Sequence, residues 1–258
     1  TGMVKGLYTA YTGMVNSQKR LDVVSNNLAN ATTTGYKKEG LTTKSFDEMM
    51  GIKIKDLTVG HLNQPIGNLS LGAKIGESYR DWSQGSFIST ESTYDFALSG
   101  KGFFNISFTS KSGETSTMYS RDGAFQMNVD GYLVTKDGDY VLGENGPVQL
   151  PTNIDKLEVQ PTGEIYADGQ YVDTFLLTDF EDYNYLEAYG ENLYRTVEGA
   201  TEAECRATVN QGYLEASNMN VVSEMVEMIT IAREYESGQK VINAVDEMLG
   251  KMVTISEL

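Results

Sequence analysis

Near its N-terminus the sequence repeats apolar residues at alternating spacings of four and three. The larger apolar side chains of this stretch are Leu7, Tyr11, Met14, Leu21 and Leu28, and the polar Gln18 and Ser25 fill the remaining positions of the repeat. Such spacing is typical of a coiled-coil seam, a narrow apolar stripe that another helix covers. The other faces of the stretch are polar. We therefore predict a helix over Val4–Leu28, about 37 Å long at ~1.5 Å per residue.

A longer pattern of the same kind lies near the C-terminus. Its seam residues are Val222, Met225, Ile229, Ala232, Tyr235, Ile242, Val245, Leu249 and Met252. Asn218 or Asn220 can cap this helix, and acidic residues lie near its first turn, where the helix dipole favours them. Gly238 interrupts the seam at a cost of about 1 kcal/mol relative to alanine. The pattern predicts a helix over Val221–Ile255, roughly 52 Å long.

Between the two ends the apolar period falls to two. Short segments rich in aromatic and β-branched residues are Phe103–Phe108, Phe125–Val129, Tyr132–Thr135, Leu157–Gln160, Glu164–Ala167 and Tyr171–Leu177. Asp-Gly occurs at 122–123, 130–131, 137–138 and 168–169, and Asn-Gly at 145–146. These dipeptides indicate β-hairpins, because type I′ turns need positive φ angles. The middle of the chain is thus predicted to form a mostly antiparallel β domain.

The predicted fold class is α+β, with long coiled-coil-type helices flanking the β domain. We expect an N-terminal helix within 1–35, an extended, irregular linker over 36–74, the β-rich domain over 75–205 and the C-terminal helix within 206–258. Two ordinary helices packed on the β domain of a monomer are the alternative. The narrow seams favour pairing with other helices, because they would bury little against a globular core.

The composition excludes several classes of function. Lys and Arg total 20 against 36 Asp and Glu, and the net charge of −16 disfavours binding to nucleic acid or to an anionic membrane. A single cysteine, Cys205, excludes an internal disulfide framework and a cysteine-rich metal site. No apolar run approaches the ~18 residues of a membrane span. The start turns polar too soon for a signal peptide, so these features suggest a cytosolic protein.

No group of residues predicts catalysis, a metal site or a cofactor site. The only histidine, His61, would have to activate Cys205, whose acidic neighbours should keep the thiol protonated. Gly100-Lys101-Gly102 lacks the remaining residues of a phosphate-binding loop. The segment 126–137 imitates a calcium-binding loop, but Gln126 occupies its first position and strands flank it, which favours a hairpin. We expect neither an enzyme nor a small-molecule substrate, and assembly is the simplest function.

Four segments resemble the rod and hook axial proteins of the bacterial flagellum. They are Leu21–Lys37, Asp95–Phe104, Tyr119–Val134 and Gln211–Leu249. The resemblance covers both ends and the middle of the chain in the right order. The chain length and the single modest β domain resemble a basal-body rod protein of the distal-rod type, because a hook protein would be longer.

The resemblance implies a structural subunit of the basal body, in the cell envelope, which stacks helically into the hollow drive shaft of the flagellum. The termini would line the inside, the β domain would lie outside, and the seams would join neighbouring subunits. It implies three kinds of partner: further copies of the chain, other rod and hook proteins, and the flagellar type III export apparatus. Export would need no cleaved signal peptide, which replaces the cytosolic expectation. A hook or hook-junction subunit and, outside the family, a secreted calcium-binding β protein are the alternatives.

Overall fold

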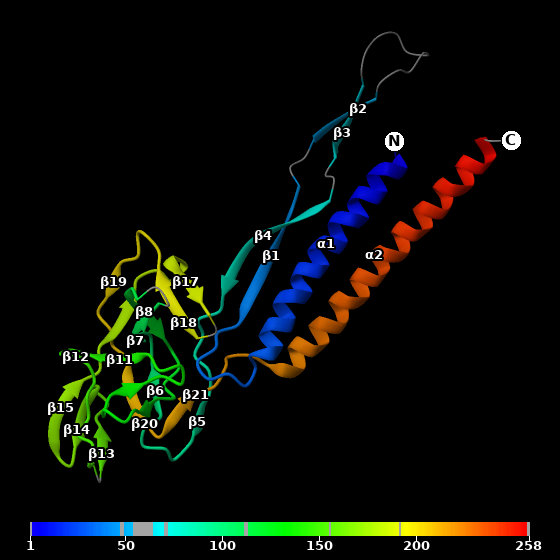
Figure 1. Cartoon of the computed structure of the whole chain (residues 1–258). Coiled ribbons are helices and arrows are strands. Elements are labelled where there is room, and N and C mark those ends of the chain that lie inside the picture. Colours follow the sequence, from blue (N-terminus) through cyan, green and yellow to red (C-terminus); the bar gives the residue numbers. More distant parts are fainter. Residues whose placement is uncertain are drawn as a thin grey trace. The chain divides into compact units, whose positions relative to one another are not determined.

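The computed structural model describes residues 2–46, 49–53, 64–69, 72–110, 113–154, 156–190 and 192–256. It divides into two compact units (Figure 1). The first, here called the helical unit, comprises residues 1–29, 39–80 and 220–258. The second, the β unit, comprises residues 30–38 and 81–219.

Two long helices, α1 (Gly2–Ala29) and α2 (Val221–Ser256), pack along each other in the helical unit (Figure 1). The Asn220 carboxamide caps α2, because its Oδ1 accepts the N–H groups of Val222 and Ser223 at 3.1 and 3.2 Å. The α+β class with two long terminal helices is therefore confirmed. Among the described helices, none has a stretch long and apolar enough to cross a membrane.

The helical unit also contains two antiparallel strand pairs. Strand β1 (Glu39–Ser45) pairs with β4 (Ala73–Arg80), and β2 (Met49–Lys53) pairs with β3 (Gln64–Leu69). Strands β1 and β4 contact α1. The structure therefore differs from the irregular backbone expected for 36–74. The sequences of β1 and β4 are mostly polar and lack the apolar alternation that burial of one face imposes, so the pattern did not predict this strand pair. His61 lies outside the described residues.

The β unit holds the remaining strands. They are β5 (Phe87–Ser89), β6 (Phe96–Ser99), β7 (Phe103–Thr109), β8 (Thr115–Ser120), β9 (Gln126–Met127), β10 (Leu133–Val134), β11 (Tyr140–Gly143), β12 (Gly146–Pro147), β13 (Leu157–Val159), β14 (Glu164–Ala167), β15 (Gln170–Thr174), β16 (Leu177–Phe180), β17 (Leu186–Tyr189), β18 (Leu193–Thr196), β19 (Glu202–Ala203), β20 (Thr208–Gln211) and β21 (Tyr213–Glu215). The largest sheet has the path β17-β18-β8-β7-β11-β10-β9, and β13-β14-β15 form a separate sheet. The pairing of these strands is antiparallel, as predicted.

Two clusters of buried side chains form the core of the β unit. The larger includes Phe96, Leu98, Phe104, Ile106, Phe125, Leu133, Val141, Val148, Leu150, Leu157, Ile165, Phe175 and Val209. The smaller one is aromatic: Phe103, Tyr119, Phe180 and Tyr194 are buried. Trp82 packs on this second cluster, 5.0 Å from Tyr194 between ring centroids. As the only tryptophan of the chain, it reports the folding of the β unit.

Four of the five predicted Gly-containing turns join consecutive strands that pair with each other. The turn at 168–169 has φ angles of +50° and +80°, the positive pair that a type I′ turn needs, and it joins β14 to β15. The segment 126–137 forms the β9–β10 hairpin and the turn that follows it. The hairpin predicted at 122–123 is wrong. Gly123 is instead required by a close approach, since an added Cβ would lie 1.8 Å from the Phe96 carbonyl oxygen.

Candidate assembly surface

Helices α1 and α2 run antiparallel, as their side-chain contacts show. Asn27 of α1 donates to Glu224 at the start of α2 at 3.4 Å, whereas Met14 lies against Gly238 further along α2. Between these contacts the Arg20 guanidinium reaches two α2 carboxylates, at 3.3 and 3.4 Å. Residues later in α1 therefore contact residues earlier in α2, as expected for antiparallel helices.

A seven-residue repeat underlies this helix pair, but its most buried members differ from the predicted seam. On α2 the repeat runs through Glu224, Ile231, Gly238 and Val245. Of these, Glu224, Ile231 and Val245 are buried, and Gly238 receives the Met14 side chain. On α1 the most buried positions include Ser17, Val24 and Asn27. The predicted seam left out the polar members because it was built from apolar residues, and it also left out the apolar Val24 and Ile231.

The predicted seam residues differ in burial. Tyr11, Val222, Met225, Ile229 and Leu249 are exposed, whereas Val245 is buried. The partly buried ones are Leu7, Met14, Leu21, Leu28, Ala232, Tyr235 and Ile242. The side chain of Met252 lies outside the described part of the chain. Burial within the chain thus accounts for only part of the predicted seam.

Three of the exposed seam residues on α2 form, together with Val226, a contiguous apolar patch, here called the α2 stripe. It consists of Val222, Met225, Val226 and Ile229, which are between 48 and 70 % exposed. Their spacing of i, i+3, i+4 and i+7 places them on one face of the helix. Helices that enter an apolar groove of a partner present such a pattern. The α2 stripe is therefore suited to binding another chain.

A second exposed apolar patch lies on α1. Tyr8, Tyr11 and Val15 are exposed, and they line a groove of about 290 Å³. Phe46 and Ile75, the latter on β4, line the same groove. The groove is mostly apolar, so it can accept apolar side chains from a partner. This patch, here called the α1 groove, is distinct from the α2 stripe.

The signature segment after α1 owes its sequence to contacts within the β unit. Gly35 has a φ of +71°, and an added Cβ would lie 2.5 Å from the Asp122 backbone nitrogen. Only glycine fits there, because both the backbone angle and the space exclude a side chain. Thr34 donates its hydroxyl to Asp122 at 2.7 Å, and the Gly35 N–H donates to the Glu215 carbonyl oxygen at 2.8 Å. The N-terminal signature is thus fastened to the C-terminal one.

A buried charge cluster completes this fastening. The Glu215 carboxylate is fully buried and accepts from Lys37 at 2.5 Å and from Arg121 at 3.4 Å. It also accepts the Gly85 N–H at 2.9 Å. Burial lowers the pKa of Lys37 below its usual range, and the Glu215 carboxylate opposes part of this shift. A buried charge is unfavourable without a partner of opposite charge, so the Glu215 carboxylate and the Lys37 and Arg121 cations depend on one another.

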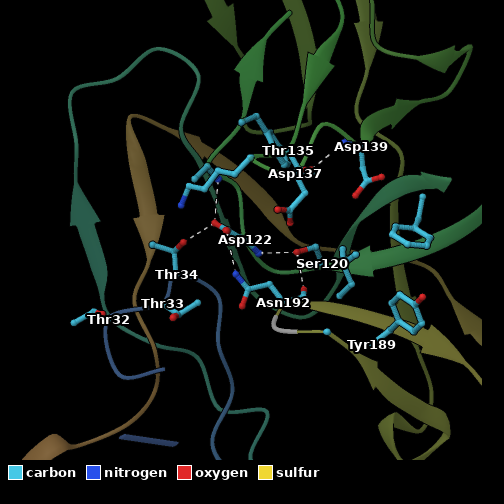
Figure 2. Close-up of a pocket in the computed structure, with 16 residues that line it drawn as sticks. Thr32, Thr33, Thr34, Ser120, Asp122, Thr135, Asp137, Asp139, Tyr189 and Asn192 are labelled. Atoms are coloured by element: carbon cyan, nitrogen blue, oxygen red, sulfur yellow. Dashed lines mark hydrogen bonds between the residues drawn. The ribbon is translucent and has the colours of Figure 1, made fainter. Parts of the chain in front are cut away.

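A cavity of about 650 Å³, lined by both polar and apolar side chains, lies beside this segment (Figure 2). Asp122 accepts a hydrogen bond there from Asn192 at 3.2 Å in addition to that from Thr34. Burial raises the pKa of Asp139, another lining residue. Within the described residues, no three His, Cys, Asp or Glu side chains are arranged to hold a metal ion. The hydrogen bonds of Asp122 are internal to the chain and stabilise its fold.

Comparison with protein-family models gives three matches. Residues 7–37 match the flagella basal body rod protein model, and residues 97–167 match the flagellar hook protein FlgE/F/G D1 domain. Residues 210–255 match the flagellar basal body rod FlgEFG protein C-terminal model. The matched ranges overlap the four segments on which the sequence resemblance was based.

Individual relatives match over almost the whole chain. The FlgG flagellar basal-body rod proteins of Agrobacterium fabrum and Bacillus subtilis are both 32 % identical to it. These matches cover 95 and 98 % of this chain and 97 and 99 % of the relatives. The FlgF protein of Caulobacter vibrioides is 31 % identical, with 95 % of both chains covered. The chain therefore belongs to the FlgG/FlgF family of flagellar basal-body rod proteins, which are structural components of the flagellum.

Proposed function

We propose that the chain polymerises helically in the rod through its terminal helices, forming a hollow shaft that transmits torque and conducts exported subunits. The α2 stripe is the observation that supports this proposal, because α1 leaves it uncovered within the chain. The neighbour's α1 groove supplies a matching apolar surface. Fully burying each large apolar side chain contributes roughly 1.5–3 kcal/mol, so four such residues favour association.

The two patches also explain why the assembly would be open-ended. A stripe on one copy that binds a different surface on the next makes a heterologous contact. Repetition of this contact by a rotation that does not close gives a helical filament rather than a ring. The net charge of −16 opposes contact at other surfaces and keeps unassembled subunits dispersed.

Further partners follow from membership of the family. We propose that the filament adjoins other rod and hook proteins and that the chain leaves the cell through the flagellar type III export apparatus. Its single cysteine suits passage of an unfolded chain, since no disulfide can form within it. In cells with a disabled flagellar export apparatus, the chain should remain inside the cell. Its normal appearance in the envelope of those cells would contradict this route.

The α2 stripe can be tested with one charge. Ile229→Asp places a carboxylate in the stripe and should prevent rod formation and motility, because burying that charge at an interface is unfavourable. Gln239→Asp adds the same charge at an exposed polar position of the same helix and should leave the rod intact. Rods are counted in purified basal bodies by electron microscopy. Normal rods in Ile229→Asp would refute the proposal.

Two predicted seam residues extend this test. Leu249 is exposed, so Leu249→Asp should prevent assembly while both units of the free chain stay folded. Leu21 is partly buried, so Leu21→Asp should prevent assembly and also weaken the helical unit. In both variants Trp82 fluorescence should show a folded β unit. Helical circular dichroism should be unchanged in Leu249→Asp and should show a weakened helical unit in Leu21→Asp. Assembly by either variant would contradict the proposed role of that residue.

A further inference from the structure

The turn between β11 and β12, in the β unit, contains the only Asn-Gly pair of the chain, Asn145 and Gly146. Asparagine is a chemically labile residue, because the backbone nitrogen that follows it can attack its side chain. A glycine in the next position favours this attack, since a Cβ there would crowd the nitrogen. Asn145 is exposed, and a Cβ added at Gly146 would meet nothing within 4 Å. The surroundings of the pair therefore leave room for the reaction.

The reaction needs only the chain and water. The backbone nitrogen of Gly146 forms a bond to Cγ of Asn145, and the bond from Cγ to Nδ2 breaks. The proton of the Gly146 amide leaves with Nδ2 as part of ammonia, and a five-membered succinimide ring remains. Water then adds to one of the two ring carbonyl carbons and opens the ring. The product is aspartate or, when the main chain now runs through Cγ, isoaspartate.

The Asn145 carboxamide has a specific partner within the β unit. Its Nδ2 donates to Oδ1 of Asp173 on β15 at 2.9 Å. Asp173 is only 5 % exposed, and its carboxylate lies against the turn, since a Cβ added at Gly143 would be 2.3 Å from its Oδ2. Among the residues that the structure describes, Asp173 has no ion-pair partner. This buried carboxylate therefore depends on hydrogen-bond donors such as Asn145.

Conversion of Asn145 would replace that donor with a carboxylate. An ionised carboxylate only accepts hydrogen bonds, so it cannot restore the lost one. Its negative charge would also lie beside that of Asp173, and like charges repel. The turn joins Val141 to Val148, two fully buried core residues whose backbones are bonded at 2.9 Å from N–H to carbonyl oxygen. A disturbed turn would therefore weaken the core of the β unit.

We propose that Asn145 is a site of spontaneous modification, whose conversion to aspartate or isoaspartate loosens the β11–β12 turn and destabilises the β unit. The hydrogen bond to Asp173 slows the reaction in the folded chain, because cyclisation must break it. Loss of ammonia makes the change irreversible, so the converted fraction records how long a chain has existed. The inference does not depend on polymerisation, because it concerns one unit of a single chain.

Peptide mass spectrometry of the full-length chain, kept in mildly alkaline buffer, tests the reaction. The peptide that contains Asn145 should gain one mass unit, whereas Asn128, which precedes the β-branched Val129, should stay unmodified. Asp173→Ala should convert up to about tenfold faster while Trp82 fluorescence still reports a folded β unit, because the restraining hydrogen bond is gone. Asp173→Asn keeps an acceptor oxygen and should convert more slowly than Asp173→Ala. Equal conversion at Asn128 and Asn145, or an unchanged rate in folded Asp173→Ala, would overturn the proposal.

The consequence is tested with Asn145→Asp, which reproduces one of the two products. Its unfolding constant, read from Trp82 fluorescence in denaturant, should rise about tenfold. Asn128→Asp is the matched control in another turn. Oδ1 of Asn128 accepts the N–H groups of Asp130 and Tyr132 at 3.0 and 2.8 Å, so aspartate keeps both bonds and should leave stability nearly unchanged. An unchanged unfolding constant in Asn145→Asp, or an equal rise in Asn128→Asp, would overturn the proposal. Failure of Asn145→Asp alone to fold would support it.

Discussion

Met14 on α1 packs so closely on Gly238 of α2 that a Cβ at 238 would lie 2.6 Å from the Met14 Cγ. Gly238→Ala should therefore destabilise the helical unit by about 1 kcal/mol, because overpacking outweighs the gain in helix propensity. Met14→Ala in the same chain should recover part of this loss. The pairwise coupling is measured by helical circular dichroism during denaturant unfolding of the four variants. Additive effects would show that the two positions are not in contact.

Alanine substitutions at Gly35 and Gly190 distinguish the stability cost of backbone strain from the cost of insufficient space for a side chain. Their φ angles are +71° and +72°, but a Cβ meets backbone at Gly35 and nothing within 4 Å at Gly190. Gly190→Ala should cost about 1 kcal/mol of strain. Gly35→Ala should cost about 2–4 kcal/mol, because backbone atoms of the β unit must also move. Both are read from Trp82 fluorescence in denaturant, and equal losses would contradict the packing at Gly35.

The carboxylate of Glu215 stabilises two buried cations. Glu215→Gln should destabilise the β unit by about 3–5 kcal/mol, because Lys37 and Arg121 lose their shared counter-charge. Lys37→Met should cost less, since Arg121 still neutralises the carboxylate. Glu204→Gln, in an exposed ion pair with Arg206, is the control and should leave stability unchanged. A smaller loss for Glu215→Gln than for Lys37→Met would contradict this order.

Alkaline pH should weaken the β unit through Tyr183. Burial, together with its 2.6 Å hydrogen bond to Asp179, raises the pKa of Tyr183 well above its ordinary value of 10.0. At a pH above 10.0 the unfolded chain releases the phenol proton, whereas the folded chain retains it. The free energy of unfolding therefore falls as the pH rises. Denaturant unfolding at about pH 8 and about pH 11 measures the fall.

Tyr183→Phe should reduce the decrease in the free energy of unfolding between about pH 8 and about pH 11, because phenylalanine has no phenol proton to release. Tyr213→Phe, which removes a hydroxyl from an exposed ring, is the matched control and should leave the slope as in the unaltered chain. An identical slope in the Tyr183→Phe chain would show that the phenol is not responsible. Burial and Glu202 also raise the pKa of Tyr119, so some dependence should remain.

Periodicity and turn residues predicted most of the fold. The helix ends lay within two residues of α1 and α2, because the pattern and the Asn220 cap both act locally. The turn at 168–169 was likewise decided by two neighbouring residues. Gly123 was misassigned because it is required by Phe96, a contact distant in sequence. The β1–β4 pair was missed because its polar surfaces leave no apolar alternation.

The sequence predicted that the terminal helices have apolar faces, but not which face is covered within the chain. Heptad spacing alone cannot distinguish Val245, which is buried, from Ile229, which is exposed. The distinction depends on polar contacts between distant residues, such as Asn27 with Glu224. A buried carboxylate at a seam position gives no apolar signal, although its spacing of seven from Ile231 could have suggested it.

Because α1 ends at Ala29 and α2 begins only at Val221, the two halves of the helical unit are made far apart in time on the ribosome. The α2 residues that contact Asn27, Arg20 and Met14 lie between Glu224 and Gly238, so α1 lacks these partners until that part of α2 has been synthesised. A product that terminates before residue 222 lacks the α2 stripe altogether and keeps an open α1. The pairing of the chain's two extremities thus acts as a check on completeness, since a truncated molecule has no stripe with which to bind its neighbour.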